Sequence, residues 1–415
     1  MPHRVGYACI NMELKETQKI HCNRGMIRRT FDAKGIRYAS ELSLQNCRDL
    51  IQVIRWNADN GIDVFRMTSC LFPWASEYQL EDLPDWEAIQ LALQAAGRVA
   101  RKNGQRLSFH PGPFNVLASP KEDVVQKAVV DLTIHGKIMD ALGMPRSPSA
   151  KINIHVGGAY GDRQASLDRF CRNFELLPDA VKTRLTVEND DRLNLYSAKM
   201  LYDGVYKQIG IPIVFDSLHY ANGPLDTDYS DALCMAVDSW PADVRPCCHH
   251  SNSRQLEDDK AKSAAHSDWY YTPFDDCDFD VDVVLESKMK ERALKKYIDD
   301  LREMMTVQTA KRPESIKYSF DDVEAGDILI TPVAKYLVTE KEHISFDVWG
   351  RRWGYDGPGL YRADGVYVLY GTALDLLDAK EPVLLIQRAY EGDQIPVLPL
   401  SWRIWKHTER QNEVG

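Results

Sequence analysis

The stretch RLTVENDD, residues 184–191, points to the fold, because it is an apolar run that ends in a carboxylate, Glu188, and then breaks into a polar loop. Five other stretches share this design, a short apolar run that ends in an imidazole or a carboxylate. They are LSFHPG (107–112), KINIHVGG (151–158), IPIVFDSLH (211–219), VRPCCHHS (244–251) and DVVLESK (282–288). Helical patterns of roughly 15–25 residues separate such segments, and an alternation repeated about eight times predicts a (β/α)8 TIM barrel.

The remaining elements follow from periodicity and from glycine and proline positions. Strands are expected at Val5–Ile10, Ile62–Met67, Arg106–His110 and Lys151–His155, and four later strands are expected to end at Glu188, Asp216, His249 and Glu286. Helices are expected near Ser43–Asn60, Asp85–Asn103, Lys121–Leu142 and Lys288–Val307. Their apolar residues recur at helical spacing, as on the predicted helix at Asp85–Asn103, which Gly104 then ends.

The polar residues at the strand ends predict a metal site. In a barrel of this kind the C-terminal strand ends converge on one mouth. A lone strand histidine is usually structural, so the argument depends on all of these residues occupying equivalent positions. Glu188, at the centre of the mouth, could bridge two ions. The candidate ligands are His110, His155, Glu188, Asp216, His219, His249, Glu286 and, in the loop after the seventh strand, His266.

The chain changes character after Lys311. Beyond it come no cysteines, few helical patterns and four of the nine tryptophans, and short apolar runs alternate with Gly- and Pro-rich turns. This pattern predicts a small β-rich domain. The expected division is a catalytic barrel at 1–308, a linker at 309–322 and a C-terminal domain of unknown role at 323–415. Its aromatic strip from Trp349 to Tyr361 is interpreted as a small core or a domain interface, although stacking on single-stranded nucleic acid is an alternative.

Composition narrows the class of protein. The formal charge of −10 gives no global attraction to nucleic acid, so DNA binding would depend on local basic patches and bound ions. Nine cysteines without a CxxC spacing indicate reduced thiols. No apolar run approaches the ~18–20 residues of a membrane span. We therefore expect a cytoplasmic protein, nucleoid-associated if the source is prokaryotic, that acts as a monomer.

The chain resembles UV-damage endonucleases, which are relatives of endonuclease IV-type apurinic endonucleases. The matching segments occur in the family's order from Gly6 to Leu294. They are GYACIN, NRGMIRRTF, FRMTSCLFP, LSFHPG, HVGG, VENDD, FDSLH, HHS and LESKMKERAL. The resemblance implies a TIM barrel with a cluster of divalent ions that cleaves damaged double-stranded DNA on the 5′ side of the lesion.

The resemblance also implies residue roles. The eight candidate ligands would hold two or three ions, with Glu188 and Glu286 as the catalytic residues. Mixed nitrogen and oxygen ligation favours Mn, with Zn or Mg as alternatives. The residues expected to contact DNA are Tyr7, Asn11, Arg66, Pro113, Phe114 and Lys288. Arg28 and Arg29 are further phosphate candidates.

Two positions depart from the family pattern. Where the family has Gln-Tyr or Gln-Phe after HPG, this chain has Pro113-Phe114. Phe114 could still act as a wedge between bases, whereas proline has lost the glutamine amide. Two residues before His249, where the family commonly has a lysine, stands Cys247, interpreted as a buried small residue rather than a zinc thiolate.

Two other functions remain open. A xylose-isomerase-like sugar isomerase or epimerase would also place His, Glu and Asp on metals at a barrel mouth. A degenerate barrel that recruits a partner through its β-rich domain is the third reading, and the complete ligand set argues against it. Phosphodiester hydrolysis suits the site, since paired ions lower the pKa of a water and clamp the phosphate.

Overall fold

The computed structural model describes residues 4–310 and the strand segments 328–330, 335–352, 359–373, 383–390 and 403–405, with side chains for 4–301. The chain divides into two compact units, Met1–Leu301 and Arg302–Gly415. Among the described residues, no helix has the length and apolar character needed to cross a membrane.

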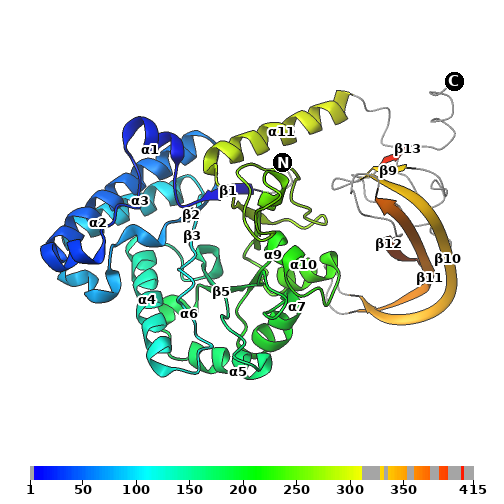
Figure 1. The fold of residues 1–415 in the computed structure, drawn as a ribbon, viewed down its shortest axis with the longest axis horizontal. Helices are drawn as coiled ribbons and strands as arrows, with labels where there is room; N and C mark the ends of the chain where they lie inside the picture. The colour runs from blue at the N-terminus through cyan, green and yellow to red at the C-terminus, as the bar shows by residue number, and fades with distance from the viewer. Residues whose placement is uncertain are drawn as a thin grey trace. The chain divides into compact units, whose positions relative to one another are not determined.

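The first unit is built on eight parallel strands in the order β6-β5-β4-β3-β2-β1-β8-β7 (Figure 1). The strands are β1 (Arg4–Ala8), β2 (Val64–Met67), β3 (Arg106–Phe109), β4 (Ile152–Ile154), β5 (Leu185–Glu188), β6 (Ile213–Val214), β7 (Cys247–His250) and β8 (Asp282–Leu285). The ring closes between β6 and β7, where the N–H of His249 donates to the carbonyl of Phe215 at 2.8 Å. The predicted (β/α)8 barrel is confirmed.

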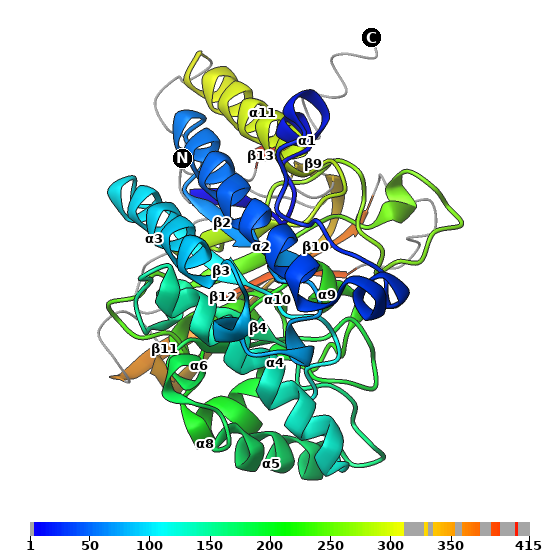
Figure 2. The ribbon, with the colours of Figure 1, turned by 90° about the vertical axis from the view of Figure 1, so that its left-hand side faces the viewer.

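Helices follow the strands and cover the outside of the barrel (Figure 2). They are α1 (Met12–Gln18), α2 (Arg28–Asp59), α3 (Trp86–Lys102), α4 (Glu122–Ala141), α5 (Arg163–Phe174), α6 (Asp179–Lys182), α7 (Ala198–Leu201), α8 (Lys207–Ile209), α9 (Ser217–Asn222), α10 (Tyr229–Asp238) and α11 (Lys290–Ala310). A π-helical turn at Tyr202–Tyr206 joins α7 to α8. The helix α2 begins at Arg28 rather than near Ser43, because it continues through a kink at Gly35, whose φ is 64°.

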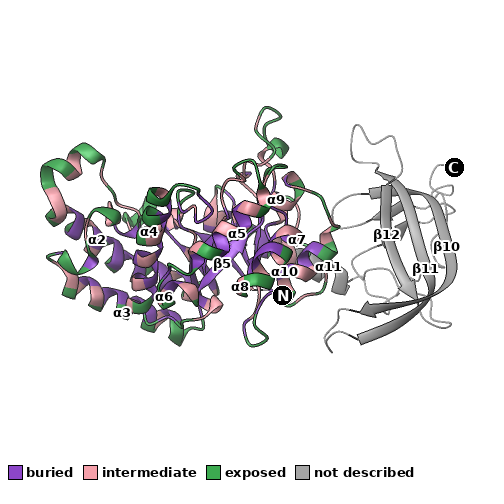
Figure 3. Cartoon of the chain, turned by 90° about the horizontal axis from the view of Figure 1, so that it is seen from below, coloured by how far each residue is buried: buried purple, intermediate pink, exposed green. Residues whose placement is uncertain are grey.

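The core lies between the strands and the inward faces of the helices, while the exposed residues gather on outer helix faces and loops (Figure 3). Inside the barrel, Val64, Val214, Cys247 and Val284 pack in one apolar cluster. Gly6 has to be a glycine, since an added Cβ would lie 1.7 Å from the carbonyl oxygen of Val64. The packed interior leaves the C-terminal strand ends as the place where polar side chains meet.

The second unit contains a five-stranded antiparallel sheet in the order β12-β11-β10-β9-β13. Its strands are β9 (Ile328–Ile330), β10 (Lys335–Arg352), β11 (Gly359–Ala373), β12 (Val383–Tyr390) and β13 (Arg403–Trp405). This pairing agrees with the expected β-rich character. The part of the predicted linker beyond Ala310 lies outside the described residues. The side chains of the aromatic strip are also outside them.

Candidate metal centre

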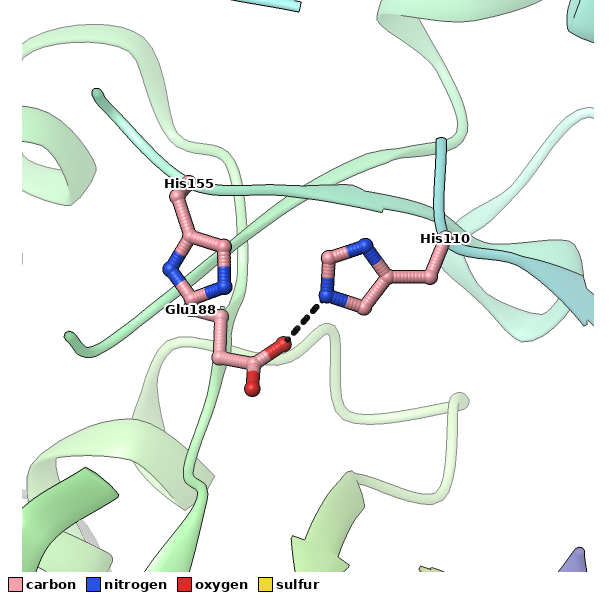
Figure 4. Close-up of side chains that lie close together, drawn as sticks. All are labelled: His110, His155 and Glu188. Carbon is pink, nitrogen blue, oxygen red and sulfur yellow. Dashed lines mark ion pairs between the residues drawn. The ribbon is translucent and has the colours of Figure 1, made fainter. Parts of the chain in front are cut away.

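Glu188, the last residue of β5, is the centre of the polar cluster at the barrel mouth. It is 1% exposed, and three imidazoles surround its carboxylate. Its Oε2 lies 3.2 Å from Nε2 of His110 and 3.1 Å from Nδ1 of His249, and its Oε1 lies 3.2 Å from Nδ1 of His219. Figure 4 shows His110 pointing at this carboxylate, with the ring of His155 beside it.

Two sets of side chains could each hold an ion, and Glu188 belongs to both. One set is His110, His155 and Glu188, and the other is Glu188, Asp216 and His249. Within each set the possible ligand atoms lie within 4.8 Å of one another. A carboxylate shared between two such sets is suited to bridge two ions, as the position of Glu188 at the mouth centre predicts.

Backbone carbonyls orient three of the histidines. Nδ1 of His110 lies 3.2 Å from the carbonyl oxygen of Pro111, and Nδ1 of His219 lies 2.9 Å from that of Asn189. Nδ1 of His266 lies 2.6 Å from the carbonyl oxygen of Glu286. Because a carbonyl can only accept, each Nδ1 carries a proton, and in the neutral ring each Nε2 keeps its lone pair for a metal.

The surroundings of the histidines shift their pKa values in different directions, so that some imidazoles are neutral and others tend to be protonated. Burial lowers the pKa of His110 to about 4, so this imidazole is neutral at neutral pH. Burial also acts to lower the pKa of His155, but Asp190 and Glu188 outweigh it and raise that pKa. Asp216 and Glu188 likewise raise the pKa of His219 against the effect of burial.

The residues present fit a divalent metal centre. Asp216 caps α9, since its Oδ1 accepts from the N–H of His219 at 2.8 Å. Its Oδ2 is buried and has no hydrogen-bond partner among residues 4–301. Buried polar atoms nearly always have a partner, and a cation would supply one here. The nitrogen and oxygen donors match Mn or Zn better than Mg.

Glu286 and His266 extend the cluster on the side of β8. Oε1 of Glu286 lies 3.1 Å from Nδ1 of His249, and its Oε2 lies 3.9 Å from Nδ1 of His266. Burial opposes ionisation of Glu286, but Arg66 and His249 hold the pKa of this carboxyl well below its ordinary value. Arg66 forms an ion pair with Glu286 across the mouth. All eight predicted ligands therefore join one connected cluster.

The choice between the neighbouring histidines of β7 is settled by their contacts. His249 is fully buried and faces Glu188 and Glu286. His250 uses both ring nitrogens elsewhere, with Ser217 Oγ at 2.7 Å and the carbonyl oxygen of Thr272 at 3.0 Å. Cys247 belongs to the apolar cluster inside the barrel and to neither candidate ligand set, in line with its interpretation as a small buried residue.

Tyr7 and Asn11 require a correction, because both are buried. The hydroxyl of Tyr7 donates to Asn57 at 2.8 Å and accepts from Asn11 Nδ2 at 3.0 Å. The oxygen of the same amide, Asn11 Oδ1, caps α1 by accepting from the N–H of Leu14 at 2.9 Å. Their polar atoms are thus used inside the protein, and neither residue is placed to contact DNA directly.

The loop after β3 forms one side of an open cavity of about 260 Å³ next to the histidines. His110, Pro113, His155, Arg192 and His219 are among the residues that line it. The side chain of Phe114, by contrast, is directed away from the protein and is 85% exposed. Lys288 is also exposed, in the turn between β8 and α11.

Three further polar residues at this site are not among the predicted site residues. Asn153 lies inside the barrel on β4, where its Nδ2 donates to Glu188 and its Oδ1 accepts from Thr186 Oγ1 at 2.8 Å. Nζ of the fully buried Lys151 lies 2.8 Å from Nε2 of His249. Asp190 lies 3.2 Å from Nδ1 of His155. The alternation Lys-Ile-Asn-Ile-His in residues 151–155 was an available signal, since it places every second side chain inside the barrel.

Comparison with known proteins gives a consistent result. The sequence model of a family described as UV-endonuclease UvdE matches residues 3–319. A UV-damage endonuclease of Schizosaccharomyces pombe is 33% identical over 305 residues, which cover 70% of this chain and 49% of that relative. A UV DNA damage endonuclease of Bacillus velezensis is 35% identical over 273 residues, which cover 62% of this chain and 80% of that relative.

Among solved structures, the chain is similar to SacUVDE, with 27% identity and a TM-score of 0.62 over 73% of this chain and 99% of that one. The chain thus spans about half the length of the Schizosaccharomyces relative (49%) and nearly the whole length of SacUVDE (99%).

Proposed function

The chain belongs to the UV-endonuclease UvdE family, and we propose that it is a metal-dependent DNA repair endonuclease that hydrolyses the phosphodiester on the 5′ side of UV photoproducts or other damaged bases. The observation that carries the proposal is the carboxylate of Glu188, which belongs to both candidate ligand sets. Hydrolysis of a phosphodiester needs charge stabilisation on both sides of the phosphorus, and a bridged pair of ions provides it.

The residues that would hold the ions come from six strand ends, the helix α9 and one loop. His110 and His155 would share one ion with Glu188, and Asp216 and His249 would share the other. His219, His266 and Glu286 would complete the coordination or hold a third ion. When bound, the ions would lower the pKa of a water and neutralise charge on the phosphate, and Mn is the metal that we expect.

The protein's own residues would prepare this chemistry. The carbonyl oxygens of Pro111 and Asn189 fix the rings of His110 and His219, so that little reorganisation is needed when ions bind. Asn153, inside the barrel, donates a hydrogen bond to the carboxylate of Glu188 and so fixes its orientation. Arg66, paired with Glu286, keeps that carboxyl ionised and places a positive charge where the phosphate would approach.

Lesion recognition would fall to the loop after β3. Phe114 is the exposed aromatic residue nearest to His110 in sequence, and an apolar wedge offsets part of the cost of unstacking bases. Pro113 stiffens the loop but cannot donate the hydrogen bonds of a glutamine. Lys288, exposed beyond β8, would contact a backbone phosphate.

The sugar-isomerase alternative is not favoured, because the family match and the curated relatives concern DNA endonucleases. A nicking assay tests the proposal. Supercoiled plasmid, irradiated or not, would be incubated with protein reconstituted with Mn, Mg or Zn in turn. We expect nicking of the irradiated plasmid that a chelator abolishes. Equal nicking of the irradiated and the unirradiated plasmid, or nicking in the presence of chelator, would contradict the proposal.

A further inference from the structure

The cavity beside the histidines has an arginine in its wall. Arg192 lies in the loop after β5 and lines this cavity together with His110, His155 and His219. Among the lining residues, all of which lie within 4–301, Arg192 is the only lysine or arginine. Its guanidinium is charged at any physiological pH. A ligand that enters the cavity therefore meets a fixed positive charge as well as three of the candidate metal ligands.

The charge of Arg192 is little used within the protein. Its one ion pair joins Nε to Oδ1 of Asp191 at 3.9 Å, and its side chain is 74% exposed. The guanidinium forms no hydrogen bond within residues 4–301. A long, exposed ion pair of this kind contributes little to stability. The donors of Arg192 are thus available to a ligand. The carboxylate of Asp190, also in the wall, lies 3.2 Å from Nδ1 of His155.

The loop that bears Arg192 is held in place at several points. The loop 190–196 is closed by a hydrogen bond of 2.9 Å from the N–H of its first residue to the carbonyl of its last. Arg163, at the start of α5, donates to the carbonyl oxygen of Leu193 at 2.5 Å and to that of Asn194 at 3.1 Å. A fixed backbone lowers the ordering cost of binding, because only the side chain of Arg192 has to be immobilised.

We propose that Arg192 binds a backbone phosphate of the damaged strand next to the scissile phosphodiester. This inference rests on the proposed endonuclease function and adds a substrate-contacting residue to it. A guanidinium offers paired donors that match the oxygens of a phosphate. Because Arg192 shares the cavity with His110 and His155, the phosphate that it binds would lie close to the ion that these residues would hold.

The first test compares Arg192→Met with the parent, both metal-loaded, on a short duplex with a single thymine dimer. The KM for nicking should rise about tenfold, as expected for loss of a charged hydrogen bond, while the metal content stays unchanged. The slope of log KM against log salt should fall by about one, because one phosphate contact is lost. Arg192→Lys keeps the charge and should retain the salt slope, with a KM between those of the parent and Arg192→Met.

A second measurement asks which phosphate Arg192 contacts. Neutral methylphosphonates would replace, one at a time, the phosphates that flank the scissile one on the damaged strand. At one position the replacement should raise the KM of the parent about tenfold and leave that of Arg192→Met unchanged, because two changes to a single contact are not additive. Equal effects on parent and variant at every position would contradict a contact between Arg192 and these phosphates.

Arg146→Met is the matched control. Arg146 is an exposed arginine that pairs with Asp140, and it lies between α4 and β4, at the opposite end of the strands from the mouth. Its replacement should leave KM and salt slope unchanged. If Arg192→Met does not fold, Arg192→Gln makes the same comparison. Parental KM and salt slope in the uncharged variants, or loss of metal from them, would overturn the inference about Arg192 alone. If the parent does not nick the duplex, the proposed function fails, and the inference fails with it.

Discussion

At the scale of single residues, Glu188 is the side chain on which the paired-ion interpretation depends. Burial opposes its ionisation, but His249, His110 and His219 hold its pKa well below the ordinary value, so it is an anion at neutral pH. Glu188→Gln keeps the shape and removes the charge. We expect a fall in nicking rate of about a hundredfold or more, since loss of even an outer partner of a ligand costs 10–100-fold in affinity or activity.

The matched control for that substitution is Glu175→Gln, because Glu175 is an exposed carboxylate paired with Lys182 away from the mouth. Nicking, bound metal and circular dichroism would be measured for both variants. Glu188→Gln should lose bound metal with an unchanged spectrum, and Glu175→Gln should match the parent. A Glu188→Gln protein with wild-type turnover and metal content would remove this residue from the centre.

Phe114 carries the prediction about damage recognition. Because its ring is 85% exposed, its removal should not destabilise the fold. Phe114→Ala should weaken binding to a damaged duplex by roughly 1–3 kcal/mol, the range for a base stacked on an aromatic ring. Fluorescence anisotropy measures this, with Leu91→Ala on the outer surface of α3 as the control. Equal affinities for the two variants would place the wedge elsewhere.

At the scale of elements, β4 illustrates what could be read from the sequence. The apolar run at Ile152–Ile154 and the terminal His155 predicted a strand with a ligand at its end, and both the strand and the position of His155 are as expected. The inward-facing Lys151 and Asn153 were missed, because a polar residue inside a strand has no marker of its own until the strand is known to lie in a closed barrel. Their partners on β5 and β7 are remote in sequence.

Among the other elements, too, some were predicted from the sequence and others were missed. The helix at Trp86–Lys102 was predicted closely, since its apolar residues keep helical spacing to a glycine stop. The first half of α2 was missed, because Arg28–Asp32 is mainly polar and Gly35 interrupts the pattern. Tyr7 and Asn11 were expected at the mouth from their strand position, but the sequence could not reveal that Asn57, from α2, takes up the tyrosine hydroxyl in the interior.

The inner face of β4 gives a prediction of its own. Asn153→Ala would leave the hydroxyl of Thr186 without its acceptor and would remove the amide donor to Oε2 of Glu188. We expect metal affinity to fall about 10–100-fold and stability to fall by about 1–3 kcal/mol, as when a buried polar partner is removed. Metal titration and chemical denaturation measure the two effects. Unchanged metal affinity would show that Asn153 does not orient the carboxylate.

At the scale of the whole molecule, metal binding and barrel stability should be coupled. The candidate ligands at strand ends come from β3 to β8, so bound ions would tie the C-terminal ends of these strands together. Metal removal should lower the Tm of the barrel by about 5–10 °C, the shift expected for a ligand present far above its Kd. Calorimetry with and without chelator measures it, and an unchanged Tm would contradict metal binding by the folded barrel.

Metal uptake should also release protons. Asp190 and Glu188 raise the pKa of His155 against burial, and Asp216 and Glu188 do the same for His219. Both imidazoles therefore tend to hold protons in the metal-free cluster, and raising the pH removes them. Metal affinity should therefore rise as the pH is increased above the ordinary histidine pKa of about 6.5. Titration calorimetry in buffers of different ionisation enthalpy counts the protons, and a pH-independent affinity without proton release would be incompatible with these shifts.

The net charge of −10 means that the protein as a whole does not attract DNA, so under the proposed function bound ions and the cations of the mouth would have to supply the local positive charge. Activity should accordingly be lost at high salt, where phosphate contacts weaken. An acidic protein can therefore belong to a family of DNA endonucleases, because only the mouth of the barrel would have to contact the duplex.

The most direct test of the endonuclease assignment is the position of the cut. A short duplex with one thymine dimer, labelled in turn on each strand, would be incubated with the manganese-loaded protein, with Glu188→Gln as the inactive control. We predict a single nick immediately on the 5′ side of the dimer, in the damaged strand alone, that requires metal and is absent from the undamaged duplex. No nick, a nick on the 3′ side, or equal cutting of the undamaged duplex would contradict the assignment.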